Sequence, residues 1–105
     1  MDASYKRLEV EDLSKIENPI LLDVREAFEL EISRLDGIVE IPMREIPSRF
    51  GELDKERPIV VVCRSGNRSA QVAMFLVSQG FADVYNLEGG MNAYARRVDT
   101  SKRAY

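Results

Sequence analysis

The fold of this chain is decided by the stretch I-V-V-V-C-R-S-G-N-R-S at residues 59–69. Its four consecutive β-branched apolar residues are typical of a strand that is buried on both faces, as in a parallel sheet. From Ser69 to Gln79 apolar residues recur at helical spacing, and Gly80 is suited to end a helix. The pattern therefore predicts that Cys63 lies where a buried strand ends and the chain turns into a helix.

This turn would place the sulfur of Cys63 at the carboxyl edge of the sheet, where open α/β sheets bind their ligands. Backbone N–H groups at the start of the helix would favour negative charge, and hence the nucleophilic thiolate. The alternative is that Cys63 is an inert buried side chain. Against this alternative, Arg64 and Arg68 flank the thiol, and a purely structural turn has no use for two arginines.

The loop from Cys63 to Ser69 resembles the active-site loop of the single-domain rhodaneses, the thiosulfate:cyanide sulfurtransferases. The segment 21–26, L-L-D-V-R-E, resembles the first motif of that family, and 87–91, L-E-G-G-M, resembles its L-x-G-G-[IM] motif. The resemblance extends over nearly the whole chain. It implies that Cys63 is the catalytic residue and carries a persulfide during the reaction. It also implies a substrate-binding loop made of Arg64, Ser65, Gly66, Asn67, Arg68 and Ser69.

Composition limits the classes of function. A chain of 105 residues, 45% of them hydrophobic, suffices for one domain over 1–105 and not for two. A net charge of −3 without a long run of one sign argues against nucleic-acid or membrane-surface binding. The apolar runs are too short to span a bilayer, and Met1–Ser4 shows no signal-peptide pattern.

The counts of cysteine and histidine narrow the chemistry. A single cysteine excludes an intramolecular disulfide and predicts a reducing compartment, the cytoplasm. Histidine is absent, which excludes a Cys/His pair and a histidine-based metal site. We expect no metal and no organic cofactor.

Strand and helix patterns alternate along the chain. This alternation predicts a three-layer α/β domain, with a mainly parallel central sheet and helices on both faces, as the rhodanese resemblance also implies. The tail from about residue 99 is polar and is expected to pack loosely. The predicted strands are 5–10, 20–24, 38–41, 59–62 and 82–86, and the predicted helical segments are 11–16, 27–32, 43–50, 69–79 and 91–98.

Asp23 and Arg25 follow the strand at 20–24, on the same edge as Cys63 if the strands are parallel. One interpretation is structural: Asp23 caps the next helix, and Arg25 pairs with a nearby glutamate. The other is implied by the resemblance, because some rhodaneses direct the matching arginine toward the bound anion. Both residues are therefore candidates for a supporting role behind the loop.

Three further features bear on the site. Gly89-Gly90 is predicted to let a loop pass close to the active-site loop, where a side chain would collide. Arg34 stands where rhodaneses usually carry a histidine, which puts local stability in doubt rather than catalysis. The tyrosines, including Tyr105, show no functional pattern.

The loop suits sulfur transfer in two half-reactions. The thiolate of Cys63 would accept the sulfane sulfur of thiosulfate, and the persulfide would pass it to cyanide, a thiol or a protein. Backbone N–H groups would stabilise the charge on sulfur, and Arg64 and Arg68 would bind an incoming oxyanion.

Two alternatives are kept. In a cysteine phosphatase or arsenate reductase the loop also holds an anion, but the tyrosine phosphatase loop is C-x5-R. Here four residues separate Cys63 from Arg68, which suits a terminal sulfur atom better than a tetrahedral phosphate. The other alternative is a carrier that receives persulfide from a protein donor. The segment 89–99 resembles the C-terminal rhodanese domains of sulfur-carrier-activating enzymes, which fits such a role.

Overall fold

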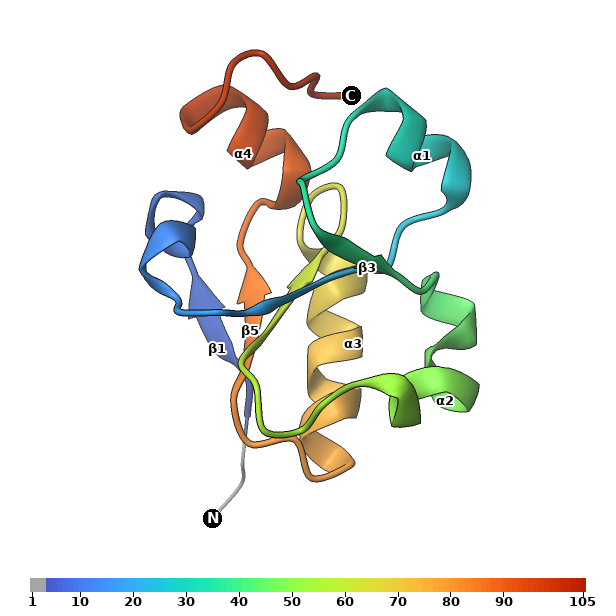
Figure 1. Ribbon diagram of the computed structural model, residues 1–105. Helices are drawn as coiled ribbons and strands as arrows, with labels where there is room; N and C mark the ends of the chain where they lie inside the picture. The colour runs from blue at the N-terminus through green and yellow to red at the C-terminus, as the bar shows by residue number, and fades with distance from the viewer. Residues whose placement is uncertain (1–3) are drawn as a thin grey trace.

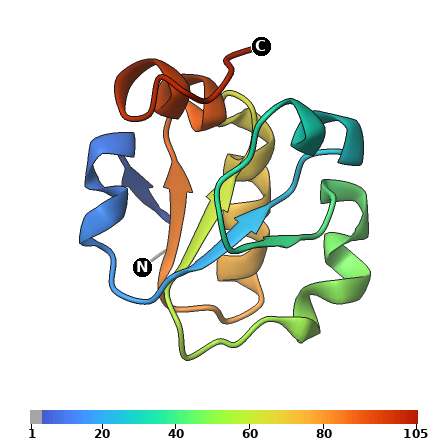
Figure 2. The same ribbon diagram turned by 45° about the horizontal axis from the view of Figure 1, so that its top comes forward.

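The computed structural model describes residues 4–105, and its centre is a five-stranded sheet with the order β1-β5-β4-β2-β3. Each of the four strand pairings is parallel. The carboxyl ends of the strands therefore meet at one edge, over which α4 and the end of the chain lie (Figure 2). The strands are β1 (Lys6–Leu8), β2 (Ile20–Asp23), β3 (Ile38–Glu40), β4 (Ile59–Val62) and β5 (Val84–Leu87).

Helices cover both faces of the sheet, so the predicted three-layer α/β architecture is confirmed (Figure 1). Within residues 4–105 no helix has the length and apolar character that crossing a membrane requires. The α-helices are α1 (Ala27–Ile32), α2 (Ile46–Arg49), α3 (Asn67–Ser78) and α4 (Gly90–Arg97), and the 3₁₀ helices are η1 (Val10–Lys15), η2 (Met43–Glu45) and η3 (Phe50–Glu52).

Strand β4 is the central strand of the core. All four of its side chains are fully buried, as its unbroken β-branched run predicts. Ile59 and Val61 pack in the cluster that contains Val72 of α3. Val60 and Val62 pack in the opposite cluster, which contains Met91 of α4. Because each buried aliphatic side chain contributes about 1.5–3 kcal/mol, the end of this strand is a rigid support for the residue that follows it, Cys63.

Some predicted bounds shift by one to three residues. Strand β1 ends at Leu8 rather than at residue 10, because Val10 begins η1 and packs in the core. Helix α3 begins at Asn67, two residues before the predicted start. The reason is Gly66, whose φ of +103° reverses the chain directly in front of the helix. Strand β5 runs two residues later at its start and one at its end than the predicted 82–86.

The expectation of a loosely packed tail is wrong for its last residue. Thr100, Ser101 and Arg103 are exposed, but Tyr105 is half-buried and its backbone N–H donates to Asn92 Oδ1 at 2.8 Å. The end of the tail therefore attaches to α4.

The N-terminal segment shows no signal-peptide pattern, and its residues 1–3 lie outside the described residues. That 1–105 forms one domain stays a prediction.

Candidate active site

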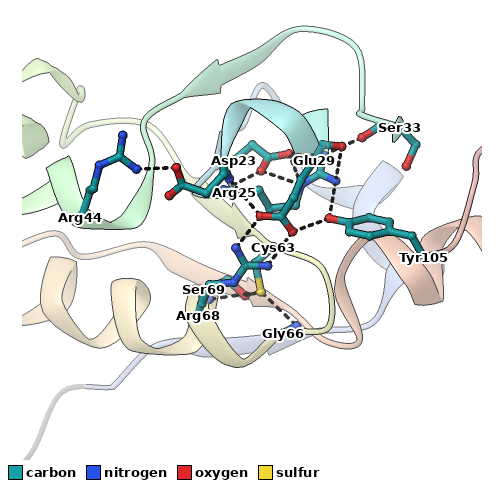
Figure 3. Close-up of polar contacts among 11 residues, drawn as sticks. Asp23, Arg25, Glu29, Ser33, Arg44, Cys63, Gly66, Arg68, Ser69 and Tyr105 are labelled. Atoms are coloured by element: carbon teal, nitrogen blue, oxygen red, sulfur yellow. Dashed lines mark hydrogen bonds and ion pairs between the residues drawn. The ribbon is translucent and has the colours of Figure 1, made fainter. Parts of the chain in front are cut away.

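Cys63 lies where the sequence predicts it, between the end of β4 and the start of α3, and only 1% of it is exposed. Its Sγ accepts hydrogen bonds from the backbone N–H groups of Gly66 at 3.1 Å and Ser69 at 3.4 Å (Figure 3). The Ser69 hydroxyl oxygen lies 3.2 Å from Sγ. Donors that converge on a sulfur atom stabilise negative charge there, so this arrangement suits a thiolate.

The glycine pair after β5 makes the close approach that the sequence predicts. Gly90 has a φ of +58°, and a Cβ on it would overlap the carbonyl group of Cys63 and lie 2.6 Å from the carbonyl carbon of Arg64. Both atoms belong to the backbone and have little room to move. Any side chain at Gly90 would therefore push α4 away from the loop, or the loop away from β4.

The N-terminus of α4 also fixes how the loop peptides are turned. The N–H of Met91 donates to the carbonyl oxygen of Cys63 at 2.9 Å, and the N–H of Asn92 donates to that of Arg64 at 3.0 Å. In a planar trans peptide the C=O and N–H groups point in opposite directions. The N–H groups of Arg64 and Ser65 therefore point away from α4.

The two arginines of the loop differ in their surroundings. Arg64 is exposed, and its guanidinium carbon lies 4.8 Å from the centre of the Tyr105 ring. Arg68 on α3 forms a bidentate pair with Glu29 of α1, at 2.7 and 2.8 Å. The pKa of the buried Glu29 is lowered to about 2, and the hydrogen bond from Arg68 is the main cause. The sequence predicts Arg68 as an anion ligand but does not predict its carboxylate partner.

The other loop residues divide into two groups. Gly66 and Ser69 are buried against the sulfur, whereas the side chains of Ser65 and Asn67 are exposed at the rim. Arg34, which stands at the position of the usual histidine, makes its ion pair with a residue outside the loop. It is exposed, and one of its terminal nitrogens lies 3.9 Å from a carboxylate oxygen of Glu40.

Asp23 and Arg25 form a buried ion pair with each other, which corrects two expectations. Asp23 accepts hydrogen bonds from the Nε and Nη2 of Arg25, each at 2.9 Å. Asp23 does not cap α1, because Glu26 is the N-cap and the Glu29 carboxylate accepts its N–H at 3.0 Å. The partner of Arg25 is therefore Asp23 and not a glutamate side chain.

The other hydrogen bonds of the Arg25 guanidinium leave it no free N–H group to donate to an anion. Nη2 donates to the carbonyl oxygen of Ser33 at 2.7 Å, and Nη1 donates to the Tyr105 hydroxyl at 2.9 Å and to the backbone carbonyl of Glu29 at 3.3 Å. All three nitrogens of the guanidinium are thus bonded, and the residue is 1% exposed. In this structure Arg25 supports the site from behind and does not face it.

Tyr105 connects the two ion pairs, and sequence reasoning missed it. Its hydroxyl accepts from Arg25 and donates to Glu29 Oε2 at 2.7 Å (Figure 3). Burial is the main cause that raises the pKa of this phenol. No local pattern marks Tyr105, because its role depends on a tail that folds back over α1.

The comparison with protein families agrees with this geometry. The family model of the rhodanese-like domain matches residues 7–97. The chain belongs to the rhodanese-like domain family. The resemblance of its three motifs to rhodaneses is thereby confirmed.

Relatives of this rhodanese-like chain include named sulfurtransferases. It is 33% identical over 95 residues to the thiosulfate sulfurtransferase GlpE of Shewanella oneidensis, which covers 88% of this chain and 94% of that protein. It is 41% identical over 111 residues to the chloroplastic rhodanese-like/PpiC domain-containing protein 12 of Arabidopsis thaliana, of which it spans 37%. The crystal structure of a rhodanese-related protein from Thermoplasma volcanium superposes with a TM-score of 0.84 at 30% identity, over 90% of this chain and 94% of the other.

Proposed function

We propose that this rhodanese-like domain transfers sulfane sulfur from thiosulfate, or another small anionic donor, to a thiophilic acceptor through a persulfide on Cys63. The observation that carries the proposal is the surroundings of the Cys63 Sγ. Two backbone N–H groups and one hydroxyl group lie within hydrogen-bond distance of the one cysteine in the chain. The membership of the family and the named sulfurtransferases among its relatives support the same reaction.

In the first half-reaction the Cys63 thiolate attacks the outer sulfur of thiosulfate. A new S–S bond forms, and the S–S bond of thiosulfate breaks, so that sulfite leaves with the electron pair. The N–H groups of Arg64 and Ser65, which α4 turns away from itself, would donate to the sulfite oxygens together with the Arg64 guanidinium. Arg68 would contribute by exchanging part of its contact with Glu29 for the substrate anion.

In the second half-reaction the acceptor attacks the outer sulfur of the persulfide. The S–S bond breaks and Cys63 leaves as a thiolate, while the acceptor keeps the transferred sulfur atom. The donors around Sγ stabilise the charge that returns to it. Cyanide, a thiol or a protein would serve as acceptor by the same chemistry, and a persulfide carrier would differ only in where its sulfur comes from. A cytoplasmic location stays a prediction from the single cysteine.

The alternative of a phosphatase or arsenate reductase is less well supported. Four residues separate Cys63 from Arg68, so the backbone turns around the sulfur with one residue fewer than C-x5-R provides.

Mass spectrometry of the intact protein tests the proposal. After incubation with thiosulfate, we expect the wild-type protein to gain the mass of one sulfur atom and to lose it on addition of cyanide, with release of thiocyanate. Cys63→Ala and Cys63→Ser should remain folded and show neither change, because no other thiol exists in the chain. Thiocyanate production by Cys63→Ala, or hydrolysis of an aryl phosphate by a protein that gains no sulfur, would overturn the proposal.

A further inference from the structure

A buried pair of polar side chains lies behind the sulfur of Cys63. Ser69 is fully buried and Asn86 of β5 is 2% exposed. The Ser69 hydroxyl donates a short hydrogen bond to Asn86 Oδ1, and the same hydroxyl oxygen lies 3.2 Å from Cys63 Sγ. Asn86 has no role in the two half-reactions of the proposed sulfur transfer.

The orientation of the Asn86 amide is fixed by its other contacts. Its Nδ2 donates to the carbonyl oxygen of Gly66 at 3.2 Å and to a carboxylate oxygen of Glu88 at 2.7 Å. Both of these partners can only accept hydrogen bonds, so a flipped amide would place its oxygen against two acceptors. Oδ1 therefore faces Ser69 and is an acceptor for it.

The hydrogen of the Ser69 hydroxyl can point in either of two directions. The Ser69 hydroxyl has one hydrogen and two neighbours that can accept it, Sγ and Asn86 Oδ1. When Cys63 is a thiol, its S–H donates to Ser69 Oγ, and the Ser69 hydrogen lies on Asn86. When Cys63 is a thiolate, the sulfur can only accept, and the Ser69 hydrogen turns to it.

We propose that Asn86 is a positioning residue that holds the hydrogen of Ser69 whenever the negative charge is not on Sγ. The proposal rests on the proposed function in one respect, that Cys63 is the reacting thiol. In the persulfide the charge lies on the outer sulfur, and the Ser69 hydrogen returns to Asn86. When the acceptor breaks the S–S bond, charge returns to Sγ and the hydrogen follows it. The hydroxyl only rotates and transfers no proton, so its buried hydrogen keeps an acceptor throughout the cycle.

Other charged side chains lie around Cys63, Ser69 and Asn86, and a test has to leave them unsubstituted because their charges also act on the sulfur. Arg68 of α3 is close enough to Cys63 to interact with its charge, and Glu29 of α1 partly neutralises Arg68. Glu88 binds the amide of Asn86 from the end of β5, and the Asp23–Arg25 pair closes the end of β2. The variants below leave all five residues in place.

The test is the rate of alkylation of Cys63 by iodoacetamide as a function of pH. The proteins compared are the wild type, Ser69→Ala, Asn86→Leu and the double variant. Ser69→Ala removes a hydrogen bond to the thiolate. We therefore expect the pH at which alkylation reaches half of its maximal rate to rise by about one unit. Asn86→Leu removes the competing acceptor, so that the hydroxyl is left with the sulfur alone. We expect its half-maximal rate at lower pH.

The double variant separates positioning from simple support of the loop. If Asn86 acts through the hydroxyl of Ser69, Asn86→Leu has no effect on the alkylation profile once Ser69 is alanine. If Asn86 only holds the carbonyl of Gly66, its replacement shifts the profile by the same amount in both backgrounds, and the proposal is overturned. A shift of Asn86→Leu to higher pH also overturns it.

A second measurement needs no change at Asn86 and covers the case in which that variant does not fold. The S–H stretching band at acid pH belongs to one thiol, because the chain has a single cysteine. We expect a lower frequency in the wild type than in Ser69→Ala, since the S–H donates to Ser69 Oγ. Equal frequencies would contradict the proposal. Neither measurement uses thiosulfate, so failure here leaves the sulfur-transfer proposal standing, and the reverse also holds.

Discussion

Two arginine–carboxylate pairs stand at the carboxyl edge of the sheet, and they differ in what surrounds them. Arg25 and Asp23 are two residues apart, both side chains are fully buried, and each guanidinium nitrogen is bonded within the protein. Arg68 and Glu29 are 39 residues apart, and 35% of the Arg68 side chain is exposed. The difference indicates that the first pair is closed and structural, whereas solvent reaches the second. Under the proposed function, the second pair would exchange its carboxylate for the substrate anion.

Replacement of Arg25 should have the largest effect on stability. Arg25→Met leaves Asp23 buried without a partner, and breaking such a pair costs about 3–5 kcal/mol of unfolding free energy. Unfolding in urea would measure the loss. Arg68→Met is the matched control, and we expect a smaller loss because solvent reaches that pair. Equal losses in the two variants would remove the distinction between the pairs.

The Arg68–Glu29 pair should make stability depend on acidity. The folded protein lowers the pKa of Glu29 from 4.5 to about 2, so its stabilising effect is complete above about pH 4.5 and is lost as the pH falls toward 2. The full shift corresponds to ~3 kcal/mol, and screening by the solvent that reaches Arg68 makes the stabilisation smaller than this. Unfolding free energies measured across this range should fall less steeply for Glu29→Gln than for the wild type. The same slope in both proteins would show that Glu29 does not carry this effect.

Arg68 should matter for activity more than Arg64 does. Loss of a hydrogen bond to a charged group costs about 1.5–3 kcal/mol, so Arg68→Ala should reduce kcat/KM for thiosulfate by about 10- to 100-fold. We expect a smaller loss for Arg64→Ala, because that side chain is exposed and its charge is screened. Thiocyanate production at varied thiosulfate would measure both. An unchanged kcat/KM in Arg68→Ala would mean that Glu29 retains Arg68 throughout the cycle.

The hydroxyl of Tyr105 should have the smallest effect of the four. Tyr105→Phe removes one hydrogen bond to each ion pair and should lower the unfolding free energy by about 1 kcal/mol. Tyr94→Phe is the control, since Tyr94 is a half-buried tyrosine that packs on the core cluster containing Met91 and belongs to neither ion pair. If both variants lose the same stability, the hydroxyl of Tyr105 does not join the pairs energetically.

The part of the site that the sequence predicts is the part encoded locally. The run Ile59–Val62, the loop and the helical spacing after it follow one another directly, so the position of Cys63 can be deduced without any distant contact. The collision at Gly90 is also predictable, because a glycine pair between a strand and a helix indicates a close approach of two backbones.

The rest of the site depends on contacts between distant segments. Glu29 reads as one of several glutamates on an amphipathic helix, and nothing near it in sequence indicates a pair with Arg68. Asp23 reads as a helix cap, but a fully buried position beside Arg25 gives its carboxylate a charged partner instead. Tyr105 and Asn86 are likewise recognisable only once the tail and β5 have been placed beside the loop.

The hydrogen bonds from α4 to the carbonyl groups of Cys63 and Arg64 have a consequence for the newly made protein. A ribosome delivers Cys63 well before Met91 and Asn92, and β5 has to enter the sheet between β1 and β4 before α4 can reach the loop. Until then the hydrogen bonds that turn the N–H groups of Arg64 and Ser65 away from α4 are missing. We therefore expect the loop of the nascent chain to acquire its full set of oriented N–H groups only when the C-terminal segment has docked.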